Sequence, residues 1–224
     1  MPRLSADLIS TADNFLNPVG DRELLLRGLR IPAIEHLGAT RDQYDLLNLA
    51  DNELTSLGNF PLLQRLKTLF LANNRIAHID ADLARVLPNL REINLTNNSL
   101  AELGDIDALA ACSSLSHIAL TGNPLVRNEH YRLYVIFRVP SVRVLDFAKV
   151  KDSERIAAKS LFTTASGAAN KLAQKYAGTR SEPSNAPSDG VREPTRPGAP
   201  LSSLSPAEAA EIKVLSYACI LNIS

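Results

Sequence analysis

The stretch LKTLFLANNRIAHI, residues 66–79, places Leu, Ile and Asn at the intervals of the pattern L-x-x-L-x-L-x-x-N-x-L. Residues 90–103, LREINLTNNSLAEL, repeat this pattern without a mismatch. Two looser copies flank them, and a degenerate first copy has Leu29 where the others have Asn. The equivalent positions are 29, 52, 74, 98 and 123, so successive copies are 22 to 25 residues apart. A regular period of this length indicates an array of stacked structural repeats.

The pattern predicts a leucine-rich-repeat solenoid. Each L-x-L segment would form a short strand, and the Asn side chain would satisfy backbone groups of the neighbouring coil. The later Leu and Ile would enter a shared apolar core that must be covered at both ends. The predicted fold class is therefore α/β: a leucine-rich-repeat solenoid with a concave parallel sheet, an N-terminal helix and a C-terminal helical cap.

Both end covers can be located in the sequence. At the front, Ser5 can cap a short helix whose apolar residues are Leu8, Ile9, Ala12 and Leu16. At the back, residues 128–138 predict a helix that Pro140 ends. A final strand would follow, with its apolar residues at Val142, Leu145 and Phe147. We then expect a helix that is capped by Asp152 or Ser153 and fades near Gly178.

Composition divides the chain into four parts. Residues 1–162 form the predicted repeat domain with its caps, and residues 163–177 a trailing helix. Residues 178–206 hold six prolines among Ser, Gly, Thr and charged residues, which predicts a disordered linker. Residues 207–224 predict a short terminal helix that docks elsewhere, with an irregular terminus as the alternative.

Several function classes are disfavoured. The sequence has no apolar run of the roughly 18–20 residues that a membrane span needs, and its start does not resemble a secretory leader, so we expect a cytosolic or nuclear protein without membrane contact. Cys112 and Cys219 are too far apart for a disulfide framework or a paired metal site. The four histidines lack metal-ligand spacing, and no phosphate loop, dinucleotide fingerprint or nucleophile elbow is present. We therefore expect no catalytic, cofactor-binding or metal-binding residues and no small-molecule substrate.

Side chains between the strand leucines should form two columns across the concave sheet. The Phe70 column comprises Leu25, Asn48, Phe70, Asn94, Ala119 and Asp146, and the Glu92 column comprises Glu23, Leu46, Thr68, Glu92, His117 and Val144. Phe70 with Leu25 and Leu46 would form an apolar patch rimmed by polar groups, as a protein interface requires. A strip of this width suits an amphipathic helix of a partner. The predicted partner-binding residues are Leu25, Leu46, Asn48, Phe70, Glu92, Asn94 and His117.

The zero net charge conceals an uneven distribution. Residues 1–126 carry 10 Lys and Arg against 15 Asp and Glu, whereas residues 127–180 carry 11 against 4. A basic block indicates phosphate-bearing partners, with a merely solvated basic surface as the alternative. A cationic edge is expected where the solenoid ends, at Arg143, Lys149, Lys151, Arg155 and Lys159. For Arg27 in the first coil, the residues favour a surface ion pair with Asp51.

Four runs of sequence go beyond a generic repeat: residues 21–40, 60–76, 95–110 and 123–151. They resemble the A-prime proteins of the U2 small nuclear ribonucleoprotein, a spliceosomal family, over about residues 1–162. The most specific element is HYRLYVIFRVPSVRVLDF at residues 130–147. The tail beyond residue 178 does not share the resemblance.

The resemblance implies a non-enzymatic nuclear adaptor. The concave face would grip the first RNA-recognition domain of a B-double-prime-like protein, and the pair would hold a stem-loop of U2 snRNA. Most base readout would come from the partner's sheet. Arg27, Lys149 and Lys151 would supply the RNA contacts of this chain, because these positions match basic residues in similar stretches.

A second function class uses the same concave face without RNA. This alternative is a regulatory or scaffolding subunit of the phosphatase-targeting or cytoskeletal kind. Added salt distinguishes these two functions. Binding of RNA through a basic edge weakens steeply with salt, whereas the affinity of an apolar protein interface changes little. The chain has no evident Lys/Arg cluster of the import type, so entry into the nucleus with a partner is the corresponding hypothesis.

Overall fold

The computed structural model describes residues 3–164 and 167–179. The predicted linker beyond Thr179 and the predicted terminal helix at residues 207–224 lie outside the described residues. In the part that is described, no helix combines the length and the hydropathy that a membrane crossing requires.

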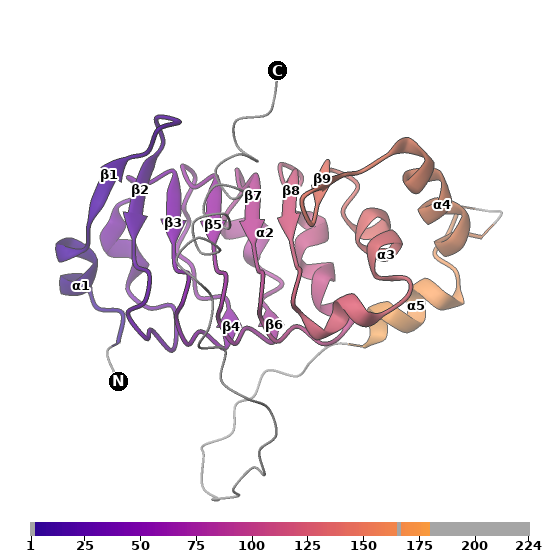
Figure 1. Ribbon diagram of the computed structural model, residues 1–224, viewed down its shortest axis with the longest axis horizontal. Coiled ribbons are helices and arrows are strands. Elements are labelled where there is room, and N and C mark those ends of the chain that lie inside the picture. Colours follow the sequence, from indigo (N-terminus) through magenta and orange to yellow (C-terminus); the bar gives the residue numbers. More distant parts are fainter. Residues whose placement is uncertain (1–2, 165–166, 180–224) are drawn as a thin grey trace, which may run out of the picture. The chain divides into compact units, whose positions relative to one another are not determined.

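An eight-stranded sheet runs through the repeats in the order β1-β2-β3-β5-β7-β8-β9-β10 (Figure 1). Its strands are β1 Asn14–Leu16, β2 Arg22–Leu25, β3 Leu46–Asn48, β5 Thr68–Phe70, β7 Glu92–Asn94, β8 His117–Ala119, β9 Val144–Leu145 and β10 Ala148–Lys149. Pairing is parallel from β2 to β9 and antiparallel at both ends. A smaller parallel pair joins β4 Ser56–Leu57 to β6 His78–Ile79. The predicted α/β solenoid with a mostly parallel sheet is thereby confirmed.

Helices close both ends of the sheet and contribute to the return segments of the coils (Figure 1). The α-helices are α1 Ala6–Thr11, α2 Leu83–Val86, α3 Tyr131–Arg138, α4 Asp152–Phe162 and α5 Lys171–Gly178. The 3₁₀ helices are η1 Leu37–Thr40, η2 Leu103–Ala111 and η3 Pro124–Arg127. α1 lies at the first coil, whereas α3, α4 and α5 lie beyond the last (Figure 1).

The front cover is shorter than predicted. The Ser5 hydroxyl accepts a hydrogen bond from the Leu8 amide at 3.2 Å, as expected of the cap, but α1 ends at Thr11. Leu16 instead belongs to β1, which pairs antiparallel with β2. The Asn17 side chain accepts from two backbone amides of the intervening turn and thereby stabilises a hairpin in place of further helix.

The back cover also differs in detail. α3 begins at Tyr131, because residues 128–130 form a turn in which the Asn128 side chain accepts from the His130 amide at 3.0 Å. The predicted final strand ends at Leu145, and Phe147 lies in the turn to β10. Lys151 is the N-cap of α4, where the Glu154 carboxylate accepts from the Lys151 amide at 2.9 Å. Asp152 and Ser153, the two caps considered from the sequence, are therefore inside the helix.

The trailing helix starts later than residue 163. The Thr164 amide donates to the Ala168 carbonyl at 2.8 Å, and Thr163 forms an antiparallel bridge with Ala169. The Asn170 side chain then caps α5 by accepting from the Ala173 amide at 3.0 Å. Two helices separated by a tight turn thus replace the predicted fading helix.

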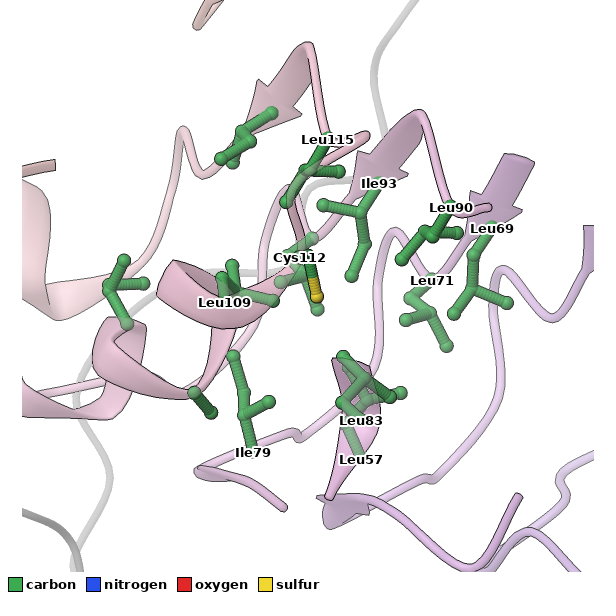
Figure 2. Packing of buried hydrophobic residues seen from close by; sticks show 14 of the residues in the cluster. Leu57, Leu69, Leu71, Ile79, Leu83, Leu90, Ile93, Leu109, Cys112 and Leu115 are labelled. Carbon is green, nitrogen blue, oxygen red and sulfur yellow. The ribbon is translucent and has the colours of Figure 1, made fainter. Parts of the chain in front are cut away.

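Leucine and isoleucine side chains of successive coils fill one continuous core. Figure 2 shows Leu69, Leu71, Leu90 and Ile93 of neighbouring coils turned toward a common interior, with Leu109 of η2 beside them. All five are at most 1% exposed. The core is therefore shared between coils and is not divided into separate units.

The repeat asparagines perform the predicted role. The Asn98 amide group donates to the carbonyls of Leu71 and Leu95, both at 3.0 Å, and its oxygen accepts from the Ile76 amide at 3.0 Å. The corresponding side chains that bridge coils in this way are Asn52, Asn74 and Asn123. Each buried asparagine thus satisfies backbone groups of two adjacent coils.

We expect Gly104→Ala to displace α5 from η2. A Cβ at Gly104 would lie 2.0 Å from the Thr179 carbonyl oxygen and 2.7 Å from that of Tyr176, so the helix end has to move. The expected loss is about 1–3 kcal/mol in the free energy of unfolding, together with faster amide exchange in α5. Denaturant titration and hydrogen exchange measure both quantities. Gly38→Ala is the matched control, because no atom lies within 4 Å of a Cβ at that position, and equal behaviour of the two variants would contradict the packing.

Candidate partner and RNA interface

Strand register brings the predicted columns together on the sheet. Phe70 pairs with Asn48 on one side and with Asn94 on the other, while Leu25 and Ala119 lie one strand further out. The Glu92 column is likewise in register, as the pairs Glu23–Leu46, Leu46–Thr68, Thr68–Glu92, Glu92–His117 and His117–Val144. Side chains in one column of a parallel sheet stand on the same face. The sequence therefore located both columns correctly except at Asp146, which was placed in the Phe70 column but lies in the turn after β9.

The predicted partner-binding residues differ in their accessibility. Leu46 is buried, whereas the others are half-buried: Leu25, Asn48, Phe70, Glu92, Asn94 and His117. Glu23 and Thr68, the neighbours of Leu46 in its column, are buried as well. The accessible apolar part of the patch thus consists of Leu25 and Phe70, whereas Leu46, on the same face, is buried.

Polar groups surround Phe70 in a defined arrangement. Asn48 donates to the Glu23 carboxylate at 3.1 Å, and Asn94 accepts from the Thr96 amide at 3.0 Å. Burial raises the pKa of the Glu92 carboxyl, and the neighbouring His117 acts in the opposite direction. An aromatic centre between fixed amides and partly desolvated carboxylates matches the anatomy of a protein-binding surface.

Phe15 is a concave residue that sequence reasoning missed. It pairs with Glu23 in the β1–β2 hairpin, so it extends the Glu92 column by one strand, and it is 47% exposed. The helical pattern through Leu16 concealed this strand. The only available signal was the turn-forming segment Asn17–Pro18 that follows.

Arg27 lies in an ion pair, as the residues alone had indicated. Its Nε contacts the Asp51 carboxylate at 2.5 Å. The other oxygen of Asp51 accepts from Asn73 at 2.6 Å, and Asn73 in turn accepts from Asn97 at 2.9 Å. Arg27 therefore begins a polar ladder that crosses the coils, and Asp51 offsets its charge.

Lys149 and Lys151 lie together at the last coil. Lys149 is exposed on β10, and Lys151 is exposed at the start of α4. Neither forms an ion pair with any described residue, and the same is true of Arg143. Arg155 was also expected at the cationic edge, and its guanidinium donates to the carbonyls of Pro140 and Val142.

The structure separates Arg27 from these two lysines. Arg27 follows β2, and Lys149 lies on β10, so six strand steps of about 4.8 Å, about 29 Å in all, lie between them. The three predicted RNA-binding residues thus do not form one patch. Lys149 and Lys151 form the basic edge, and Arg27 belongs to the opposite end of the sheet.

The described residues provide no site for metal or covalent chemistry. No group of three His, Cys, Asp or Glu side chains within residues 3–164 and 167–179 could hold a metal ion. Burial raises the pKa of the Cys112 thiol to about 11, so this cysteine is protonated and unreactive at neutral pH.

Comparison with known proteins agrees with this description. A family model for leucine-rich repeats matches residues 1–177. The human U2 small nuclear ribonucleoprotein A' is 49% identical over 213 residues, which cover 95% of this chain and 80% of the relative. The chain belongs to the U2 small nuclear ribonucleoprotein A' family.

Other members of the family and a solved structure agree. The U2 small nuclear ribonucleoprotein A' of Aspergillus fumigatus is 49% identical over 84% of this chain and 74% of its own length. The crystal structure of the Drosophila melanogaster SNF/U2A' complex matches with a TM-score of 0.71 and 46% identity, covering 75% of this chain and 96% of the other. As a member of this family, the chain has a role in the U2 small nuclear ribonucleoprotein and is a non-enzymatic adaptor.

Proposed function

We propose that the chain binds the RNA-recognition domain of a B-double-prime-like protein and that the pair holds a stem-loop of U2 snRNA in the nucleus. The observation that supports this most is the half-buried Phe70 at the centre of the concave sheet, in a chain 46% identical to the U2A' of the SNF/U2A' complex. A large aromatic side chain held between polar neighbours is typical of an interface centre.

The concave face suits an amphipathic helix of the partner. Leu25 and Phe70 would receive the apolar side of that helix, and Phe15 would add contact at the first strand. Glu92 and the amides of Asn48 and Asn94 would meet its polar flanks. The partner-binding set is thus Leu25, Leu46, Asn48, Phe70, Glu92, Asn94 and His117, of which Leu46 is the most buried.

The basic edge would contact phosphates and leave base readout to the partner. Lys149 and Lys151 can approach a backbone from the end of the sheet, because no described carboxylate pairs with them. Arg27 would need to leave Asp51 to contact RNA, and it would do so at the other end of the sheet.

We expect Lys149→Ala/Lys151→Ala to weaken RNA binding by the assembled pair and to reduce its salt dependence. Each lost phosphate contact lowers the slope of log affinity against log salt by roughly 0.7–0.9. Fluorescence anisotropy with labelled U2 stem-loop RNA at several salt concentrations measures the slope. Lys171→Ala/Lys175→Ala on α5 is the matched control, because it removes equal charge from exposed positions elsewhere. Equal slopes for the two double variants would contradict a phosphate-binding edge at Lys149 and Lys151.

A further inference from the structure

The turn between β9 and β10 holds an exposed aromatic residue in a strained conformation. Leu145 pairs with Ala148, and the two residues between them, Asp146 and Phe147, have φ values of +50° and +62°. Turns of this kind favour Asn, Asp or Gly, whereas a bulky side chain in the left-handed region is rare. Phe147 is nevertheless 60% exposed, so packing of its ring does not compensate for the conformation.

Other groups hold this turn in place. The Asp146 carboxylate accepts from the Leu120 amide at 2.7 Å and from the Tyr131 hydroxyl at 2.6 Å. Arg132 donates to the Leu145 carbonyl at 3.0 Å while it also forms a two-point ion pair with Glu154 of α4. A strained backbone that is held in place by several surrounding hydrogen bonds and ion pairs is a feature of functional sites.

Several basic residues lie near Phe147 in the sequence. Lys149 lies two residues after Phe147, on β10, and Lys151 lies at the start of α4. Arg143, whose carbonyl accepts from the Val150 amide, is exposed on the opposite side of the hairpin. Among the acidic residues of this segment, Asp146 and Glu154 are engaged as described, and Asp152 is exposed. Residues 127–180, in which Phe147 lies, carry 11 Lys and Arg against 4 Asp and Glu.

We propose that Phe147 stacks on an unpaired RNA base while Lys149 and Lys151 contact the adjoining phosphates. An aromatic side chain beside unpaired cations is the usual combination in single-strand binding, because every base has a face for stacking and every nucleotide a negative charge. Centres of protein interfaces, in contrast, are depleted of lysine. A base inside a duplex offers no free face, so the site selects single-stranded RNA. This assignment rests on the proposed role of the basic edge in RNA binding.

The test uses the full chain and a 12-nucleotide single-stranded RNA with one central 2-aminopurine. Anisotropy of an end label gives the dissociation constant, and quenching of 2-aminopurine reports stacking. Phe147→Gly removes the ring and suits the left-handed backbone, so we expect a melting temperature at least equal to that of the wild type. We expect the dissociation constant to rise roughly 5- to 150-fold, the effect of losing one base stack, and the quenching to disappear. Phe147→Tyr keeps an aromatic ring, so we expect the dissociation constant and the quenching of the wild type.

Two comparisons make the outcome decisive. Leu62→Ala removes an exposed apolar side chain between β4 and β5 and should leave RNA affinity and quenching unchanged. A blunt duplex of the same sequence should show no effect of residue 147. Wild-type affinity and quenching in Phe147→Gly would overturn the proposal.

Co-elution of each variant with the RNA-recognition-domain partner separates the remaining cases. If Phe147→Gly loses the partner but retains RNA binding, the ring is a protein contact and the proposal is overturned. If the wild-type chain fails to bind the partner, the proposed adaptor function is wrong, but quenching that depends on Phe147 would still support the stacking site.

Discussion

Phe70→Asp is expected to abolish binding of the RNA-recognition-domain partner while the fold stays intact. Phe70 stands on the concave face between Asn48 and Asn94, outside the leucine core, so a carboxylate there can remain hydrated in the free chain. At an interface centre, the same carboxylate would be desolvated and unpaired. The variant loses an aromatic anchor and buries a charge at the interface. Together these two effects predict that the affinity for the partner falls at least about 30-fold.

Isothermal titration calorimetry measures this loss, and a thermal melt checks the fold. Leu62→Asp is the matched control, because Leu62 is 55% exposed and belongs to neither column of the sheet. It should bind as the wild type does. Unchanged affinity in Phe70→Asp would remove the concave patch from the proposed interface.

Leu95→Ala is expected to lower the free energy of unfolding by about 2–5 kcal/mol. Leu95 is fully buried, and its carbonyl accepts hydrogen bonds from Asn98 and Asn123, so its coil is packed and bonded on both sides. Truncation would leave a cavity between coils that cannot collapse without disturbing these bonds.

Denaturant titration of the full chain gives this value. Leu62→Ala is the comparison, and at this exposed position we expect a change within about 0.5 kcal/mol. If Leu95→Ala proved as stable as Leu62→Ala, the register of the repeat would be incorrect.

The repeat could be predicted because the same residue types recur at equivalent positions in successive coils and make the same contacts. Asn52, Asn74, Asn98 and Asn123 occupy equivalent positions and make equivalent hydrogen bonds, so one correct assignment fixes the strands, the columns and the core. Because each coil stacks on its neighbour, the same arrangement of strand, turn and core residues recurs from coil to coil. The concave position of Phe70 followed from this register.

The ends of the solenoid were harder to predict, because no period constrains them. Leu16 fitted a helix by spacing, but the Asn17 side chain stabilises a turn that makes it part of a strand. Phe147 fitted a strand by its alternation with Leu145, but bonds from Leu120 and Tyr131 to Asp146 fold this segment into a turn. These contacts join residues from different elements, and sequence spacing does not reveal them.

The separation of Arg27 from Lys149 followed from the repeat. The roles of these basic residues in RNA binding were assigned from matching stretches of sequence, and such a match carries no information on distance. Counting coils placed Arg27 at the first repeat and the lysines after the last, as the structure has them. The pairing of Arg27 with Asp51 was also foreseeable, because the two residues occupy neighbouring coils at the same edge of the sheet.

The most direct test of the adaptor role is size-exclusion chromatography of the full chain with the RNA-recognition domain of a B-double-prime protein, with and without U2 stem-loop RNA, at two salt concentrations. We expect a binary peak at both salt concentrations and a ternary peak that loses RNA at the higher one, because the protein interface is centred on the apolar side chains of Leu25 and Phe70 and the RNA contact is ionic. Absence of any complex under all four conditions would contradict the adaptor role.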